Sequence, residues 1–150
     1  MKRICFICHG NICRSTMAEF VLKDMVKRLN LEGYTIESRA TSYEEIGNDT
    51  HYGTKEILRK YNIPFNKRKA IHLEATDYSK YDYFIGMDSA NIRNSMKILE
   101  RENNTKIFRF LDITDEPRDI SDPWYTGNFE QTYQDVLKAS KALVNKLEGI

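Results

Sequence analysis

The sequence has few cysteines and no long apolar run. Its three cysteines, Cys5, Cys8 and Cys13, all lie near the start of the chain. They cannot form a disulfide framework, because no distant cysteine exists for them to join. The apolar run at the N-terminus is too short for the core of a signal peptide or for a membrane-spanning helix. These absences predict a protein of the reducing cytoplasm that does not bind membranes.

An excess of charge of either sign is also absent. Lys and Arg total 23 and Asp and Glu total 22, which gives a formal net charge of +1. Proteins that bind nucleic acids or membrane surfaces usually show a strong basic excess. We therefore expect no nucleic-acid partner and a local site for any anion. The 150 residues, 41% of them hydrophobic, predict one domain over residues 1–150, with a monomer favoured.

Short apolar runs alternate with longer amphipathic segments. Strands are expected at residues 3–7, 34–40, 83–87 and 106–111, and helices at residues 54–60, 89–100 and 129–147. A further helix is expected after a cap at Ser15 or Thr16, with Glu19 completing a capping box. Its apolar stripe consists of Ala18, Val21, Leu22, Met25 and Leu29. This alternation predicts an α/β fold: a doubly wound four-stranded parallel sheet, flavodoxin-like with order 2-1-3-4, and helices on both faces.

The loop after the first strand carries the strongest chemical signal. Ligands of such sheets bind beyond the carboxyl ends of the strands. The segment at that position after the first strand is residues 8–15 (CHGNICRS), here called the phosphate loop. Backbone N–H groups and a helix N-terminus there favour an anion. Gly10 and Asn11 are the two residues of the loop best able to adopt the left-handed backbone conformations that tight anion-binding loops need. Arg14 supplies a planar fork for two phosphate oxygens.

Cys8 opens this loop and is the expected nucleophile. Amides, a helix terminus and Arg14 should make its thiol ionise more readily than a free one, and a thiolate beside a phosphate cradle can attack phosphorus. Cysteine, five residues, arginine and then serine is the signature of cysteine-dependent phosphatases. The pattern Cys5-x-x-Cys8-His9 also fits covalent haem attachment, a redox pair or zinc, but each interpretation is weak. We therefore expect no metal and no cofactor.

Two further segments strengthen the pattern. Asp122-Pro123-Trp124-Tyr125 lies near the C-terminus, and residues 81–88 (YDYFIGMD) precede a helix. With the phosphate loop, they make the chain resemble the low-molecular-weight protein tyrosine phosphatases over essentially its whole length. This resemblance implies hydrolysis of phosphotyrosine in protein substrates through a cysteinyl-phosphate intermediate. In the reaction that the resemblance implies, Cys8 is the nucleophile, Arg14 is the phosphate clamp, and Asp122 is the general acid and base.

The resemblance also implies supporting roles. The expected substrate-binding residues are His9, Gly10, Asn11, Ile12, Cys13, Ser15, Trp124 and Tyr125. Among these, Asn11 is expected to shape the loop, and Ser15 to hydrogen-bond the thiolate, cap the helix or do both. Ser38 would brace the loop, and Asp88 and Asn91 would support it. Cys8 and Cys13 are placed for a reversible disulfide, which the sequence permits and does not show.

Some positions depart from the family pattern. Thr16 replaces a usual proline, Ala40 a usual glycine, His9 is an unusual residue at the rim, and residues 68–71 lack a histidine. Thiol-coupled arsenate reductases are excluded because no cysteine follows Cys13. Protein-arginine phosphatases tend to carry threonine at position 12, so Ile12 favours phosphotyrosine. A non-catalytic phosphate-binding module stays an alternative, but it would need neither Cys8 nor Asp122.

Overall fold

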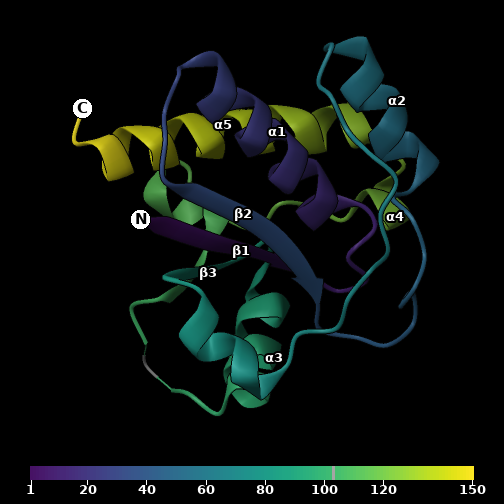
Figure 1. The fold of residues 1–150 in the computed structure, drawn as a ribbon. Helices are drawn as coiled ribbons and strands as arrows, with labels where there is room; N and C mark the ends of the chain where they lie inside the picture. The colour runs from purple at the N-terminus through teal and green to yellow at the C-terminus, as the bar shows by residue number, and fades with distance from the viewer. Residues whose placement is uncertain (103) are drawn as a thin grey trace.

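The computed structural model describes residues 1–102 and 104–150 and is built on a parallel sheet (Figure 1). Its strands are β1 (Lys2–Cys8), β2 (Tyr34–Ala40), β3 (Tyr83–Gly86) and β4 (Ile107–Arg109). Their order is β2-β1-β3-β4, with all neighbouring pairs parallel. The predicted fold class and strand order are therefore confirmed. They place the end of β1 at the centre of the sheet's carboxyl edge.

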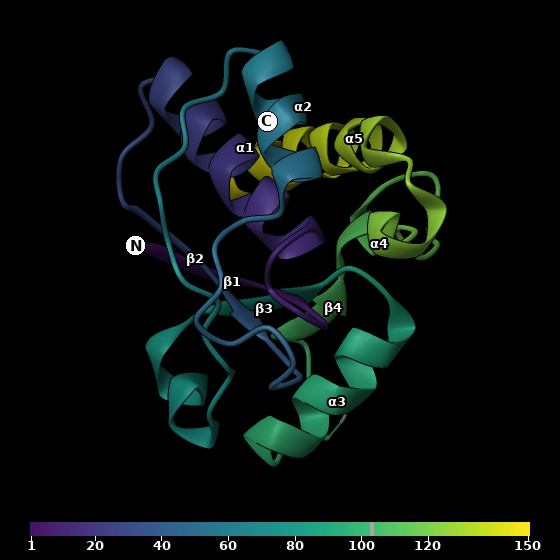
Figure 2. The same cartoon turned by 90° about the vertical axis from the view of Figure 1, so that its right-hand side faces the viewer.

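Helices cover both faces of the sheet. The α-helices are α1 (Arg14–Arg28), α2 (Tyr52–Lys60), α3 (Ser89–Leu99), α4 (Pro123–Thr126) and α5 (Phe129–Glu148). Two 3-10 helices, η1 (Ala75–Lys80) and η2 (Phe110–Ile113), complete the described elements. Figures 1 and 2 show α1 and α5 side by side on one face, next to α2, and α3 on the opposite face. None of the helices within residues 1–102 and 104–150 is long and apolar enough to cross a membrane.

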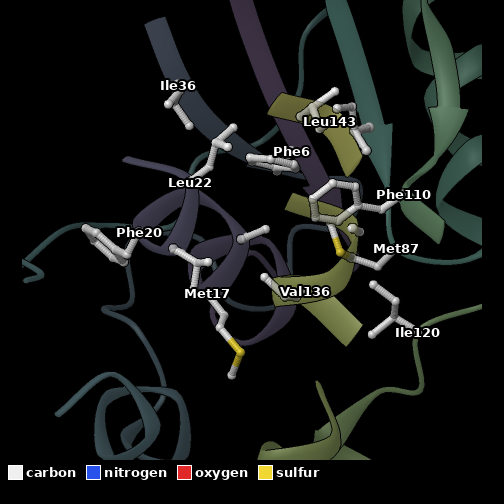
Figure 3. Close-up of a cluster of buried hydrophobic side chains, with 14 of the residues drawn as sticks. Phe6, Met17, Phe20, Leu22, Ile36, Met87, Phe110, Ile120, Val136 and Leu143 are labelled. Carbon is white, nitrogen blue, oxygen red and sulfur yellow. The ribbon is translucent and has the colours of Figure 1, made fainter. Parts of the chain in front are cut away.

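The alternation of β1 side chains joins two apolar layers. Ile4 and Phe6 point into the larger cluster beneath α1 and α5, whereas Cys5 and Ile7 belong to the cluster on the α3 side. Phe6 contacts Phe110 at a ring-centroid distance of 5.0 Å, in the group of buried side chains that Figure 3 shows. A strand buried on both faces explains the unbroken apolar run of the sequence. This packing fixes the position from which the phosphate loop departs.

The start of α1 differs from the prediction. The helix begins at Arg14, and its N-cap residue, Cys13, makes no side-chain capping hydrogen bond. Ser15 and Thr16 lie within the first turn, because the tight loop enters the helix earlier than the pattern indicated. Thr16 Oγ1 donates to the Ile12 carbonyl at 3.1 Å, and Glu19 accepts from Ser38 Oγ at 2.5 Å, so the predicted capping box is wrong.

Other bounds differ modestly. Leu29 is the C-cap of α1 and 54% exposed, so the predicted apolar stripe ends before it. Strand β4 stops at Arg109, because Phe110 enters the 3-10 helix η2 instead of continuing the strand. The short helix α4 was not predicted; it follows Pro123, whose fixed φ suits the first helical position. Apart from α4, these differences lie at the ends of elements, where tertiary packing overrides local pattern.

Candidate active site

A cavity of about 90 Å³ opens where β1 gives way to α1. Three segments line it: the phosphate loop, the loop after β2, and residues 122–127, here called the acid loop. The structure therefore brings together Cys8, Arg14 and Asp122, which are far apart in the sequence. The complete lining consists of Cys8, His9, Gly10, Ile12, Cys13, Arg14, Glu44, Glu45, Asp122, Trp124 and Tyr125.

The sulfur of Cys8 lies among hydrogen-bonding groups. Its side chain lines the cavity although the residue is only 3% exposed. The Asn11 backbone N–H donates to Cys8 Sγ over 3.3 Å, and Ser15 Oγ lies 3.0 Å from the same sulfur. Donors that face a sulfur stabilise its anionic form. This arrangement suits a thiolate nucleophile.

The other two cysteines lie in different surroundings. Burial raises the pKa of the Cys13 thiol to about 12, and the nearby negative charge of Cys8 adds to the effect. Burial likewise raises the pKa of Cys5 well above its ordinary value inside the sheet. All three are free thiols. Cys5 and Cys13 are therefore thiols near neutrality, and neither shares the donors that surround Cys8.

Arg14 is held in one orientation at the cavity wall. Its Nη1 donates to Asp88 Oδ2 and to the Ile120 carbonyl, both at 2.8 Å, and its Nη2 lies 3.4 Å from Asp122 Oδ2. Burial disfavours its charge, but the anions of Cys8, Asp122 and Asp88 outweigh burial and raise the pKa of Arg14. The guanidinium is therefore permanently charged and already oriented for an anion that enters the cavity.

Asp122 is fixed by its position before α4. It is the N-cap of that helix, with Oδ1 accepting from the Trp124 N–H at 3.0 Å. Pro123 follows in the first helical position, and Asp122 has the extended backbone that a following proline favours. Its side chain is 24% exposed, so one oxygen can meet a substrate in the cavity. Trp124 and Tyr125, 56% and 83% exposed, stand beside it at the mouth.

Of the two residues best able to adopt a left-handed backbone in this loop, only Asn11 does so, with a φ of 58°. At Gly10 the backbone lies close to the loop after β2, and a Cβ there would come within 3.3 Å of Glu45 Cγ. Asn11 and Ser15 are fully buried and do not line the cavity. They support the loop from beneath: Asn11 Nδ2 donates to Ser15 Oγ at 2.8 Å and to Ser38 Oγ at 2.9 Å.

The supporting residues occupy the places that the resemblance implied. Ser38 contacts Asn11, and Asp88 contacts Arg14. Asn91 Oδ1 accepts from the N–H groups of Met87 and Asp88, each at 3.0 Å. This contact stabilises the turn that carries Asp88.

Several residues near the site were not predicted. Glu44 and Glu45 line the cavity, and Glu44 Oε2 lies 3.0 Å from His9 Nε2 at the exposed rim. Arg68 donates to the backbone carbonyl of Asn11. Nothing in the local pattern of these charged residues distinguishes them from surface residues, so their roles depend on the tertiary fold. In residues 1–102 and 104–150, no group of three or more His, Cys, Asp or Glu side chains could hold a metal ion.

Comparison with known proteins agrees with this geometry. The family model of the low molecular weight phosphotyrosine protein phosphatases matches residues 3–149. The chain is 37% identical to the low molecular weight protein-tyrosine-phosphatase PtpA of Staphylococcus aureus, over 97% of this chain and 93% of that protein.

Solved structures show the same likeness. YfkJ from Bacillus subtilis is 36% identical with a TM-score of 0.94, over 99% of this chain and 96% of that one. SP-PTP, a low molecular weight protein tyrosine phosphatase from Streptococcus pyogenes, is 42% identical with a TM-score of 0.87, over 98% and 93% of the two chains. The chain belongs to the low molecular weight phosphotyrosine protein phosphatase family.

Proposed function

We propose that this enzyme hydrolyses phosphotyrosine in proteins, that residues 1–150 act as one domain, and that Cys8 carries the phosphoryl group between two steps. The observation that supports this most strongly is the meeting of Cys8, Arg14 and Asp122 around one small cavity. A nucleophile, a fixed cation and a carboxyl group are the parts that transfer of a phosphoryl group requires.

In the first step the Cys8 thiolate attacks phosphorus. The bond between sulfur and phosphorus forms while the bond from phosphorus to the tyrosine oxygen breaks. Asp122, in its carboxylic acid form, gives its proton to that oxygen, so tyrosine leaves as a neutral phenol. Arg14 and the N–H groups of the phosphate loop hold the remaining phosphate oxygens as negative charge shifts among them. The products of this step are phosphocysteine and the Asp122 carboxylate.

In the second step water completes the hydrolysis. The Asp122 carboxylate takes a proton from water while the water oxygen attacks phosphorus. The bond between sulfur and phosphorus breaks, and inorganic phosphate leaves. Cys8 regains its negative charge, which the Asn11 N–H and Ser15 hydroxyl stabilise, and Asp122 regains its proton. The enzyme returns to its starting state without any other reactant.

The substrate assignment depends on the mouth of the cavity. Trp124 and Tyr125 present exposed aromatic surface beside Asp122, which suits a phenyl ring. Ile12 lines the wall with an apolar side chain where a threonine would be typical of protein-arginine phosphatases. Both features favour phosphotyrosine. The proposed setting is the cytoplasm, because a reducing compartment keeps the Cys8 thiol free.

The test compares substrates and removes the nucleophile. The wild-type enzyme should hydrolyse p-nitrophenyl phosphate and release phosphate from phosphotyrosine peptides faster than from phosphoserine or phosphoarginine peptides of the same sequence. Cys8→Ser should lose turnover but keep its fold, judged by circular dichroism. An inactive wild type, or a Cys8→Ser variant that turns over equally well, would refute the proposal. Preference for phosphoarginine would refute the substrate assignment alone.

A further inference from the structure

Arg68 lies under the phosphate loop and contacts a single loop residue twice. Its Nη1 donates to the backbone carbonyl of Asn11 at 2.8 Å, and its Nη2 donates to the side-chain oxygen of Asn11. Arg68 is half-buried and does not line the cavity. It therefore has no direct contact with a substrate there, and its hydrogen bonds reach the reacting sulfur only by way of Asn11.

The contacts of Asn11 fix which way its side-chain amide points. Asn11 Oδ1 faces two groups that can only donate, the Arg68 guanidinium and the Ile71 backbone N–H at 3.1 Å. Its Nδ2 therefore faces the hydroxyls of Ser15 and Ser38. One of its two hydrogens is donated to Ser15 Oγ and the other to Ser38 Oγ. A flipped amide would set donor against donor at Arg68, so this orientation is the stable one.

The orientation of the amide in turn fixes two hydroxyl protons. Each serine accepts from Asn11 and has one hydrogen left to donate. Ser38 donates its hydrogen to the Glu19 carboxylate, which can only accept. Among the contacts of the described residues, the acceptor left for Ser15 is Cys8 Sγ at 3.0 Å. The Ser15 proton therefore points at the sulfur.

The backbone contact acts on the same sulfur by a second route. Asn11 has a left-handed φ of 58°, a conformation that few residues other than glycine and asparagine adopt. Arg68 holds the carbonyl of this residue, whose own N–H donates to Cys8 Sγ at 3.3 Å. Both donors to the sulfur thus depend on how Arg68 holds Asn11.

We propose that Arg68 is a positioning residue of the reaction, which directs the Asn11 N–H and the Ser15 hydroxyl at the Cys8 sulfur. This role rests on the function proposed above. Burial lowers the pKa of Arg68, while the anions of Glu19 and Cys8 oppose that effect, so the cation and the thiolate attract each other. The interaction favours the anionic sulfur both as the attacking group and as the leaving group.

The test replaces Arg68 in the full chain and follows hydrolysis of p-nitrophenyl phosphate. Arg68→Met removes both donors, and kcat should fall about 10- to 100-fold, the size expected for loss of a hydrogen bond to a charged group. The acid limb of the kcat/KM profile should move to higher pH, because the thiolate loses stabilisation. Arg68→Lys keeps the charge and one donor group, so it should recover part of both effects. Arg93→Met, on the exposed face of α3, is the matched control and should behave as wild type.

A double-mutant cycle with Ser15→Ala separates positioning from general destabilisation. If Arg68 acts through Ser15, Arg68→Met should cost clearly less in the Ser15→Ala background than in wild type. Multiplicative losses would overturn the route through Ser15, and a wild-type kcat and pH profile in Arg68→Met would overturn the proposal as a whole. Thermal unfolding checks the fold of each variant, and if Arg68→Met does not fold, the same cycle with Arg68→Lys decides by the same criterion. An inactive wild type would instead refute the proposed function, so the two failures are distinguishable.

Discussion

The phosphate loop and the acid loop line the same cavity but are held very differently. In the phosphate loop, Asn11 and Ser15 are fully buried and hydrogen-bonded to each other, and Asn11 is also hydrogen-bonded to Ser38 of β2. In the acid loop, Trp124 and Tyr125 are mostly exposed, and Asp122 is fixed chiefly by capping α4. One side of the cavity is rigidly positioned by the core, and the other meets the solvent.

This difference separates two tasks of the enzyme. The phosphoryl group is the same in every substrate, so the groups that hold it gain from being positioned before the substrate binds. The group attached to the phosphate varies, and exposed aromatic side chains can adapt to it. We therefore expect changes in the phosphate loop to slow all substrates alike, and changes in the acid loop to alter the ranking of substrates.

The largest effect on this comparison is expected from Arg14→Lys. Lysine keeps the charge but lacks the planar fork of arginine. In Arg14 this fork is held by hydrogen bonds to Asp88 and to the Ile120 carbonyl. We expect kcat to fall about 10²- to 10³-fold, as when an oxyanion donor is removed. The loss should be similar for aryl phosphates and peptides in steady-state assays. Arg59→Lys, at an exposed position of α2, is the control, and a loss that depends strongly on the substrate would contradict the comparison.

Asp122→Asn should give the next largest effect, and one that varies with the leaving group. Asparagine can still accept from the Trp124 N–H and cap α4, but it cannot donate an acidic proton. We expect kcat for phenyl phosphate to fall about 10²-fold, the lower end of the range for loss of a general acid. Dinitrophenyl phosphate should lose much less, because its leaving group needs no proton. Equal losses for both esters in stopped-flow assays would rule out Asp122 as the acid.

Trp124→Ala should have a smaller effect, confined to binding. The indole is 56% exposed, and loss of its contact with a phenyl ring should raise KM for phosphotyrosine peptides about two- to tenfold. Inhibition by inorganic phosphate should stay unchanged, because the ion has no ring to contact. The KM for the peptides and the inhibition constant for inorganic phosphate are measured on the same preparation. A parallel weakening of phosphate inhibition would show that the two loops are not separate in function.

The smallest effect concerns stability away from both loops. Glu130 of α5 accepts from Lys60 Nζ at 2.6 Å and from Tyr61 and Gln134, which lowers its pKa from 4.5 to about 2. A group whose pKa falls on folding stabilises the folded state above its unfolded pKa and loses this contribution as pH falls. Wild type should therefore lose more stability than Glu130→Gln between pH 4.5 and 2. Urea unfolding across this range is the measurement, and identical pH dependences would contradict the contact.

The sequence predicted the sheet because its physical signals are local. The β1 run is buried on both faces, and helical periodicity identified α3 and α5 closely. The ends of elements were less predictable. The phosphate loop enters α1 at Arg14, and Phe110 turns out of β4, because of contacts with distant segments that no local pattern contains.

The candidate site shows the same division. Cys8, Arg14 and Asp122 lie in two motifs, each readable in the sequence, and the fold brings both motifs to one cavity. Arg68 and Glu19 were missed because each is a single charged residue whose partner comes from another segment. Gly10 and Asn11 were both candidates for a left-handed backbone and only Asn11 adopts it, because conformational freedom alone does not show which residue uses it.

The most direct test of the whole account is to trap the phosphorylated enzyme. Wild type is mixed with p-nitrophenyl phosphate, quenched in acid during turnover, digested and examined by mass spectrometry. We predict a phosphoryl group on the peptide that contains Cys8, located on its sulfur and absent from Cys13. Turnover without any phosphorylated peptide, or with the phosphoryl group on another residue such as His9, would contradict the proposed mechanism.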